Sequence, residues 1–197
     1  MSIMNTIILL ATLKKEGRSN TETLCEFLKS RIEKQGGTAE IVKLAAHDIL
    51  PGTCTDMGSD DWPGILAKIT AADAIVFATP VWWGGHSSLM QRVIERLDEL
   101  HDEILAGMTS RLYRKAFGIV VTGDSDGAEH ITGNLANFAN ALGMHFPPYA
   151  TLTVLSEKLA KDKEPTREEL FALYEKDYAK TADTMVSELS RTADSSR

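Results

Sequence analysis

The chain has 197 residues, of which 43% are hydrophobic and 25% charged, and its formal net charge is -7. This length is enough for one domain with a sizeable core. The acidic balance argues against nucleic-acid binding, because that affinity comes largely from basic contacts to phosphate. No apolar run reaches bilayer-spanning length, and the first residues lack the basic segment of a signal peptide. We therefore expect a cytoplasmic protein without a membrane partner.

The first third of the chain alternates strand and helix patterns. A continuous apolar run at residues 7–11 predicts a strand, and residues 20–35 predict a helix with one apolar face. Residues 40–44 predict a second strand, followed by a long irregular connection. Asp61 is expected to cap a helix that runs to about residue 71, with Pro63 in its first turn.

The centre of the chain joins a buried strand to an amphipathic helix through an aromatic loop. Residues 74–78 are an apolar run, and the strand should stop at Pro80, which cannot donate a ladder hydrogen bond. Two tryptophans, two glycines and two serines intervene. From Leu89 to Ile104 the apolar residues recur at helical spacing, which predicts one helix with Arg96 on a polar face.

The last third repeats the alternation. Residues 116–122 predict a fourth strand, and a helix follows a glycine-rich loop and ends near Leu142. A fifth strand is expected within residues 144–155. Thr166 and Glu169 have the spacing of a capping box, so a final helix should start there, fade after residue 189 and leave residues 190–197 as a flexible tail.

Five strands that alternate with five helices predict an α/β fold with a doubly wound parallel sheet. With five strands we expect the flavodoxin-like order 2-1-3-4-5, helices on both faces, and a single domain over residues 1–189. In that order the loops after strands 1, 3 and 4 converge on one edge of the sheet. They comprise residues 12–21, 79–88 and 122–130.

The first of these loops leads directly into a helix. It gathers hydroxyls, an amide, a glycine and three cations at a helix N-terminus, which is a ready site for an anion. We expect a phosphate to contact Ser19, Asn20 and Thr21, with Thr12 on the far side. The alternative is that Ser19 only caps its own helix, since Ser19 and Glu22 also have capping-box spacing.

The second loop suits a flat ligand, because its glycines let backbone N–H groups approach closely and its indoles offer faces for stacking. Trp82 and Trp83 could equally cover the core edge or a subunit contact. The third loop, from Thr122 onward, could reach the other end of a ring, or it could be a polar connector with a helix cap. The two cysteines, Cys25 and Cys54, have no metal-type spacing, and Cys25 is expected to be a buried thiol.

Residues 72–84, which end in Thr-Pro-Val-Trp-Trp-Gly, resemble the flavin-ring loop of the NAD(P)H-dependent FMN reductases. The loop with Thr12-Leu13-Lys14 and Ser19-Asn20-Thr21 resembles that family's phosphate loop, and residues 91–96 resemble the start of its third helix. The resemblance covers roughly residues 7–155. It implies a flavodoxin-like fold, bound FMN, reduction by NADH or NADPH, and a homodimer or homotetramer with the flavin near a subunit interface.

The resemblance also implies which residues contact the cofactor. On the phosphate side, in the ring loop and in the third loop these are Thr12, Lys14, Ser19, Asn20, Thr21, Pro80, Val81, Trp82, Trp83, Gly84, Thr122 and Gly123. Ala11-Thr12 stands where the family usually has Gly-Ser, and Asp124 and Asp126 replace usual glycines. The connection around Cys54 resembles iron–sulfur flavoproteins, but one cysteine cannot hold a cluster, so we expect no metal.

The resemblance implies that the flavin carries the hydride chemistry, so no side chain need be a conventional catalyst. A small-molecule acceptor such as a quinone, free flavin or azo compound would then take the electrons. Three other classes compete. A flavodoxin-type electron carrier would bind FMN without direct NAD(P)H activity. A response-regulator receiver would need acidic residues where Ala11 and Thr12 stand, and a binding protein would hold no flavin.

Overall fold

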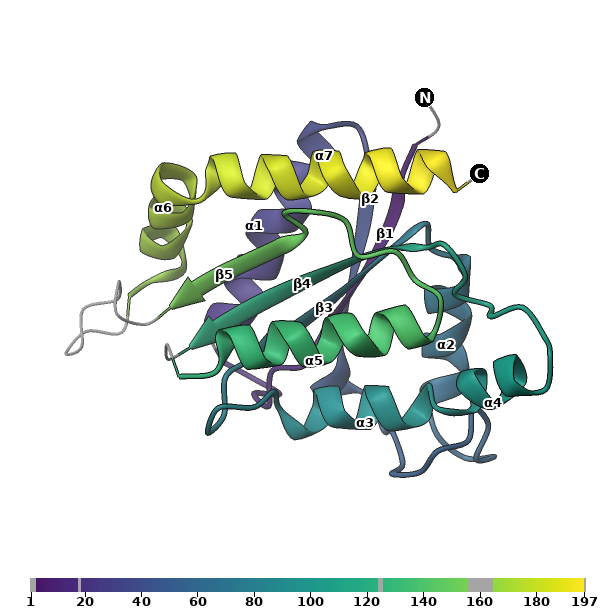
Figure 1. Cartoon of the computed structure of the whole chain (residues 1–197). Helices are drawn as coiled ribbons and strands as arrows, with labels where there is room; N and C mark the ends of the chain where they lie inside the picture. The colour runs from purple at the N-terminus through teal and green to yellow at the C-terminus, as the bar shows by residue number, and fades with distance from the viewer. Residues whose placement is uncertain (1–2, 18, 124–125, 156–164, 197) are drawn as a thin grey trace.

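The computed structural model describes residues 3–17, 19–123, 126–155 and 165–196, and it forms three layers with a sheet between two sets of helices (Figure 1). The sheet contains β1 (Asn5–Leu10), β2 (Thr38–Lys43), β3 (Ala74–Pro80), β4 (Ala116–Gly123) and β5 (Thr151–Leu155). Its strands are all parallel in the order β2-β1-β3-β4-β5, as predicted. The flavodoxin-like α/β fold is thereby confirmed.

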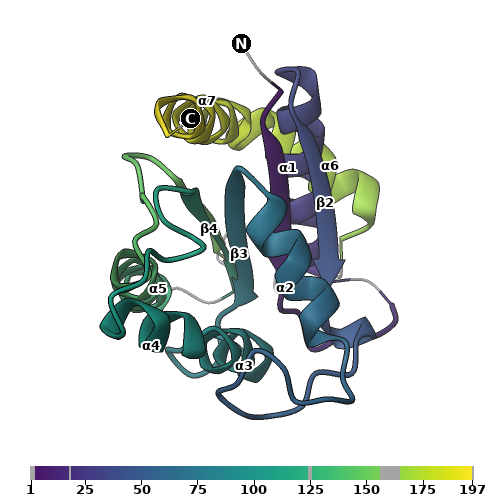
Figure 2. The ribbon, with the colours of Figure 1, turned by 90° about the vertical axis from the view of Figure 1, so that its right-hand side faces the viewer.

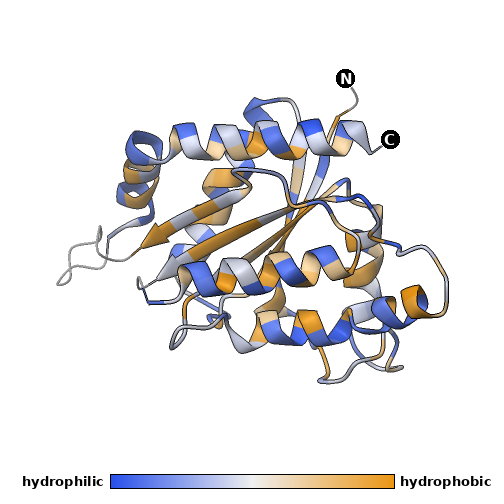
Figure 3. Ribbon diagram, viewed as in Figure 1, coloured by the Kyte–Doolittle hydropathy of each residue, from blue (hydrophilic) through white to orange (hydrophobic). Residues whose placement is uncertain are grey.

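Two apolar cores lie on opposite faces of the sheet. One is covered by α2 (Trp62–Ala71), α3 (Ser88–Arg96), α4 (Glu99–Leu105) and α5 (Ala128–Ala141). The other is covered by α1 (Asn20–Lys34), α6 (Arg167–Asp177) and α7 (Ala179–Ser195), and Figure 2 shows these across the sheet from α3, α4 and α5. Because both faces are covered, the central strands are continuous apolar runs, which Figure 3 shows in orange.

The elements follow the predicted order, with two differences in the extent of the helices. The expected helix from Leu89 to Ile104 is divided into α3 and α4 at residues 97–98. Backbone bonds from the Asp98 N–H to the Glu95 carbonyl and from the Leu100 N–H to the Leu97 carbonyl tighten the joint into a turn. Both leucines stay buried across it, and no glycine or proline signals the break.

The C-terminal helix pair shows the second difference. The capping box is confirmed, because the Thr166 hydroxyl accepts from the Glu169 N–H and the Glu169 carboxylate accepts from the Thr166 N–H. The predicted helix, however, is divided into α6 and α7 at Tyr178. The expectation of a flexible tail after residue 189 was wrong for residues 190–195, which are helical. Thr192 and Ala193 are buried there, so packing continues the helix where the apolar pattern thins.

A buried arginine helps to hold the C-terminal helices against α1. Arg31 on α1 donates to Asp183 on α7, with 2.7 Å from its Nε to Oδ1, and to Glu175 on α6 at 3.1 Å. The Arg31 hydrogen bonds to Asp183 hold the pKa of that carboxyl below its usual value. Arg31 thus links the three helices that cover this face of the sheet.

The N-terminus of α2 also differs from expectation. Pro63 does lie in the first turn, and Asp61 stands at the N-cap position, but the Asp61 side chain makes no capping bond. It accepts instead from the backbone N–H of Asp48 at 2.9 Å. The carboxylate of the neighbouring Asp60 accepts from the N–H of Trp62, the first residue of α2, at 3.3 Å.

Candidate flavin site

The three predicted loops meet at the carboxyl edge of the sheet. The hydroxyls of Thr21 and Thr122 are 2.6 Å apart, which joins the first loop to the third. The Ser87 hydroxyl donates to the Ala11 carbonyl at 2.7 Å, which joins the second loop to the first. This edge lies at the arrowheads of β4 and β5 in Figure 1 and is where doubly wound sheets bind ligands.

The first loop holds a chain of buried hydroxyls. Ser19 caps α1, since its Oγ accepts from the Glu22 N–H at 3.3 Å, as the capping alternative predicted. The same hydroxyl donates to Thr12 Oγ1 at 2.9 Å, and Thr12 also accepts from the Lys14 N–H at 3.4 Å. With both lone pairs engaged, Thr12 keeps its own proton to donate. Capping by Ser19 therefore leaves a donor for an anion in this loop.

The negative charge of Glu22 near this loop is offset by a lysine from a neighbouring strand. Glu22 lies in the first turn of α1, where a carboxylate would repel a phosphate. Lys43, the last residue of β2, pairs with it, with 2.8 Å from Nζ to Oε2. The first N–H groups of α1, those of Asn20 and Thr21, have no intrahelical carbonyl partner, because a helix begins there. The neutralised carboxylate leaves the positive end of the helix available to an anion.

The second loop is a short hairpin with an exposed tip. Trp82 and Gly85 exchange two backbone hydrogen bonds, of 2.7 and 2.9 Å. Between them Trp83 and Gly84 have φ of 48° and 75°, the sign pattern of a type I′ turn, which a tryptophan adopts only with strain. Trp83 is 98% exposed and Trp82 is 51% exposed. Trp83 therefore does not cover the edge of the core, whereas Trp82 is half-buried.

The second and third loops are in direct backbone contact. A Cβ on Gly127 would lie 2.5 Å from the Gly84 carbonyl oxygen, so the approach requires a glycine at position 127. The Val81 N–H donates to the Thr122 carbonyl at 2.8 Å. Gly123 faces Val81 closely as well, since its Cβ would come within 3.2 Å. Asp124 lies outside the described residues, and Asp126 is exposed beside this contact.

Of the predicted site residues, some are brought into contact and others only share the edge. The hydroxyls of Thr12, Ser19, Thr21 and Thr122 form two buried pairs. Pro80 and Val81 lead from β3 into the hairpin of Trp82, Trp83 and Gly84. Lys14 is exposed in the first loop, and Asn20 is the first residue of α1.

A buried ion pair at the C-terminal end of α3 was missed by the sequence reasoning. Arg96 on α3 pairs with Asp60, and neither side chain has any exposed surface. Its guanidinium also donates to the carbonyls of Cys54 at 2.7 Å and Leu50 at 3.0 Å. Its burial could have been predicted from the spacing, because Arg96 follows the apolar Val93 by three residues and so lies on the same face of the helix.

This pair binds the irregular connection before α2 to the helix after the ring loop. Burial alone would raise the pKa of Asp60, but hydrogen bonds from Arg96 and from the Leu50 and Trp62 N–H groups outweigh it and lower the pKa. The guanidinium also lies 5.6 Å from the Trp62 ring centroid, a cation–π distance. The connection is thus held by charge-assisted bonds to α3.

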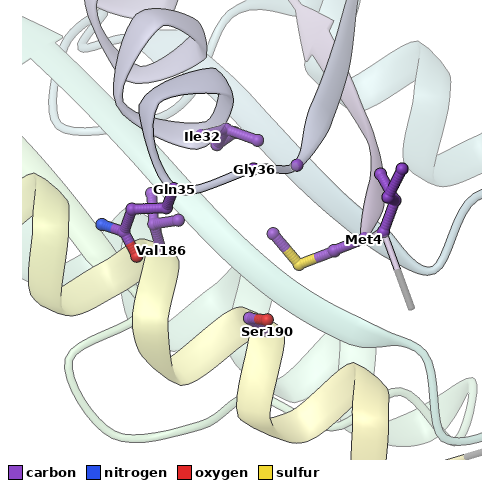
Figure 4. A pocket seen from close by; sticks show the side chains of 8 residues that line it. Met4, Ile32, Gln35, Gly36, Val186 and Ser190 are labelled. Atoms are coloured by element: carbon purple, nitrogen blue, oxygen red, sulfur yellow. The ribbon is translucent and has the colours of Figure 1, made fainter. Parts of the chain in front are cut away.

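A cavity lies at the opposite edge of the sheet, between α1, α7 and the start of β1 (Figure 4). It measures about 250 Å³, and Met4, Ile32 and Val186 give it an apolar wall. Gln35 lines it too, but its amide already donates to the Asp183 carbonyl at 3.2 Å. None of the residues that line this cavity belongs to the three loops, so the two sites are separate. Within the described residues, no three His, Cys, Asp or Glu side chains are grouped as a metal site requires.

Comparisons with known proteins identify the family of the chain. The model of the family described as NADPH-dependent FMN reductase matches residues 4–157. Over 160 residues the chain is 34% identical to 8-demethyl-8-aminoriboflavin-5'-phosphate synthase of Streptomyces davaonensis, which covers 75% of this chain. It is 32% identical over 146 residues, 71% of this chain, to a protein of Mycobacterium bovis named divalent metal cation transporter MntH. The matches span 62% and 21% of the lengths of these two relatives.

A solved structure supports the same assignment. The crystal structure of RosB with bound 8-demethyl-8-formylriboflavin-5'-phosphate aligns with a TM-score of 0.77 at 27% identity. The alignment covers 98% of this chain and 79% of RosB. None of the helices in the described part of this chain is both long and apolar enough to cross a membrane. On the family match and the shared fold, the chain belongs to the NADPH-dependent FMN reductase family of flavodoxin-like flavoproteins.

Proposed function

We propose that the chain is an FMN-dependent oxidoreductase that takes electrons from NADH or NADPH and passes them to a small acceptor. The observation that carries this proposal is the convergence of a hydroxyl-lined helix N-terminus with an aromatic hairpin at one sheet edge. The first suits the phosphate of FMN and the second suits its ring. The family membership supports both assignments.

The residues of the first loop fit a phosphate in chemistry and charge. Thr12 would donate its remaining hydroxyl proton, and the N–H groups of Asn20 and Thr21 would donate at the positive end of α1. In the Thr21–Thr122 pair one hydroxyl donates to the other, so the accepting partner also keeps a proton. Lys14 adds positive charge from the exposed side of the loop.

The residues of the second and third loops fit a ring. The glycine contact between positions 84 and 127 brings two backbones together without side chains, and the half-exposed Trp82 offers an indole face. Bound FMN would supply the hydride-accepting and electron-donating chemistry. The chain would bind and orient it, and no side chain is assigned as a catalytic acid or base. Quinones, free flavins and azo compounds are the acceptor classes that we propose.

Anaerobic mixing of the FMN-loaded protein with NADH and with NADPH tests the proposal. Bleaching of the oxidised flavin absorbance within seconds supports a reductase, and the faster nucleotide identifies the preferred donor. Bleaching by dithionite but by neither nucleotide would replace the reductase with the flavodoxin-type electron carrier. A purified protein that is colourless and binds no added FMN would contradict both.

The relatives favour a second candidate in which the riboflavin phosphate is a substrate. One is named as a synthase of an 8-demethyl-8-aminoriboflavin phosphate, and the RosB structure holds an 8-demethyl-8-formylriboflavin phosphate. Mass spectrometry of the flavin recovered after aerobic incubation with excess FMN separates the two candidates. An unchanged mass supports the reductase, and a changed ring supports the flavin-modifying enzyme.

A further inference from the structure

The ring loop is closed at its base by buried hydrogen bonds. The Ser87 N–H donates to Thr79 Oγ1 at 3.0 Å, and the Thr79 hydroxyl donates to the Pro80 carbonyl at 3.0 Å. Thr79 and Ser87 are both buried. The strand end and the start of α3 are therefore tied together, and the hairpin with Trp82 and Trp83 projects from this base.

The Ser87 hydroxyl does more than cap its helix. As the N-cap of α3, its Oγ accepts from the Met90 N–H at 3.3 Å, and a cap requires only that acceptor. Its proton goes to the Ala11 carbonyl at 2.7 Å. Ala11 directly precedes Thr12, and its own N–H donates to the Ala78 carbonyl at 2.8 Å. One buried hydroxyl thus joins the base of the ring loop to the start of the phosphate loop.

We propose that Ser87 is a positioning residue that sets the distance between the phosphate side and the ring side of the flavin site. The inference rests on the proposed function, because it concerns a ligand that carries both groups. FMN gains affinity over riboflavin only if its phosphate and its ring reach their partners together, and that gain depends on matched spacing. Ser87 acts through Ala11 and Thr79 and is not assigned a contact with the ligand.

Titration of flavin-free protein with FMN and with riboflavin tests this role. The variants are Ser87→Ala and Ser87→Gly, and the control is Ser88→Ala, which alters the neighbouring exposed serine. We expect both Ser87 variants to lower the ratio of FMN affinity to riboflavin affinity about 10-fold, because a bond between the two loops is lost. The control should keep the wild-type ratio.

The choice of variants separates positioning from capping. Glycine retains most of the N-cap preference that alanine lacks, so a defect in Ser87→Ala alone would identify a cap and overturn the proposal. Equal weakening of both flavins would overturn it too. Equal affinity of the wild-type protein for FMN and riboflavin would overturn the phosphate assignment and with it the role of Ser87, whereas the reductase proposal is tested separately by mixing with NADH and NADPH.

Hydrogen exchange of the flavin-free protein gives a readout that needs no ligand. Loss of the Ser87–Ala11 bond should speed exchange of the Ala11 and Lys14 amides, which are bonded at the start of the first loop. Ser88→Ala should leave these amides unchanged. Faster exchange confined to the first turn of α3 would show that Ser87 holds only its own helix, and the proposal would fail.

Discussion

Arg96 and Asp60 form an ion pair in which neither side chain reaches solvent, at the C-terminal end of the helix that follows the ring loop. Removal of one partner leaves the other charge buried and unpaired, which costs about 3–5 kcal/mol. We expect Arg96→Met and Asp60→Asn each to lower the free energy of unfolding by that amount. The double variant should lose less than the sum. Urea unfolding of all four proteins measures the coupling, and strict additivity would contradict a paired role.

The same pair predicts a pH dependence. The folded pKa of Asp60 is lower than its value of 3.8 in the unfolded chain, so ionised Asp60 stabilises the fold above that pH. The contribution is lost as pH falls below 3.8 and through the folded pKa. The stability difference between wild type and Asp60→Asn should therefore be constant at neutral pH and shrink below about pH 4. A difference that grows with acid would contradict this assignment.

Backbone contact between the ring loop and the third loop predicts that Gly127→Ala impairs flavin binding. The new Cβ would meet the Gly84 carbonyl at 2.5 Å, so one loop must move. We expect FMN affinity to fall about 10-fold or more, because a small displacement disrupts ring contacts. Gly133→Ala on α5 is the matched control, since nothing lies within 4 Å of its Cβ. The control should bind FMN normally and gain about 0.5–1 kcal/mol of stability.

The Glu22–Lys43 pair predicts an electrostatic effect on FMN that riboflavin does not share. Lys43→Met would expose the phosphate to the Glu22 charge and should weaken FMN binding about 3- to 10-fold at low salt. Adding Glu22→Gln should restore affinity. Riboflavin carries no phosphate and should bind all variants alike. Equal losses for both flavins would show that Lys43 acts on the fold instead.

The two cysteines should differ in reactivity. Cys25 is fully buried, and burial first, then the charges of Glu22 and Glu26, raises the pKa of its thiol. Cys54 is exposed. A thiol reagent at pH 8 should label one cysteine in the native protein and both after unfolding, because the thiolate reacts. Cys54→Ser should abolish native labelling, and persistent labelling would show that Cys25 becomes accessible.

The exposed hairpin tip predicts self-association. We propose a homodimer or homotetramer that buries part of Trp82 and Trp83, since an indole that is 98% exposed favours contact with another surface. Sedimentation at micromolar concentration should show an oligomer, and Trp83→Ser should shift it toward monomer. Tyr149→Ser, at another exposed aromatic with positive φ, should leave the assembly intact. A monomeric wild type would refute the proposal.

Local patterns in the sequence were enough to determine the fold and the edge that carries the candidate site. The apolar runs of the central strands specify burial on both faces, and alternation with helices then restricts the sheet to a parallel order. The N-cap at Ser19 and the capping box at Thr166 depend on neighbours a few residues apart, so their spacing also sufficed. The convergence of the three loops followed from strand order alone.

Only the tertiary structure decided which partner each polar group takes. Thr21 meets Thr122 across 101 positions, and Ser87 meets Ala11 across 76, because the sheet brings them to one edge. Arg96 was expected on a polar face and is buried because Asp60 and the carbonyls of Cys54 and Leu50 surround its guanidinium. The helix breaks near residues 97 and 178 likewise lack a local signal. For Thr21, Ser87 and Arg96 the deciding contact joins segments distant in sequence, where hydropathy and spacing carry no information about the partner.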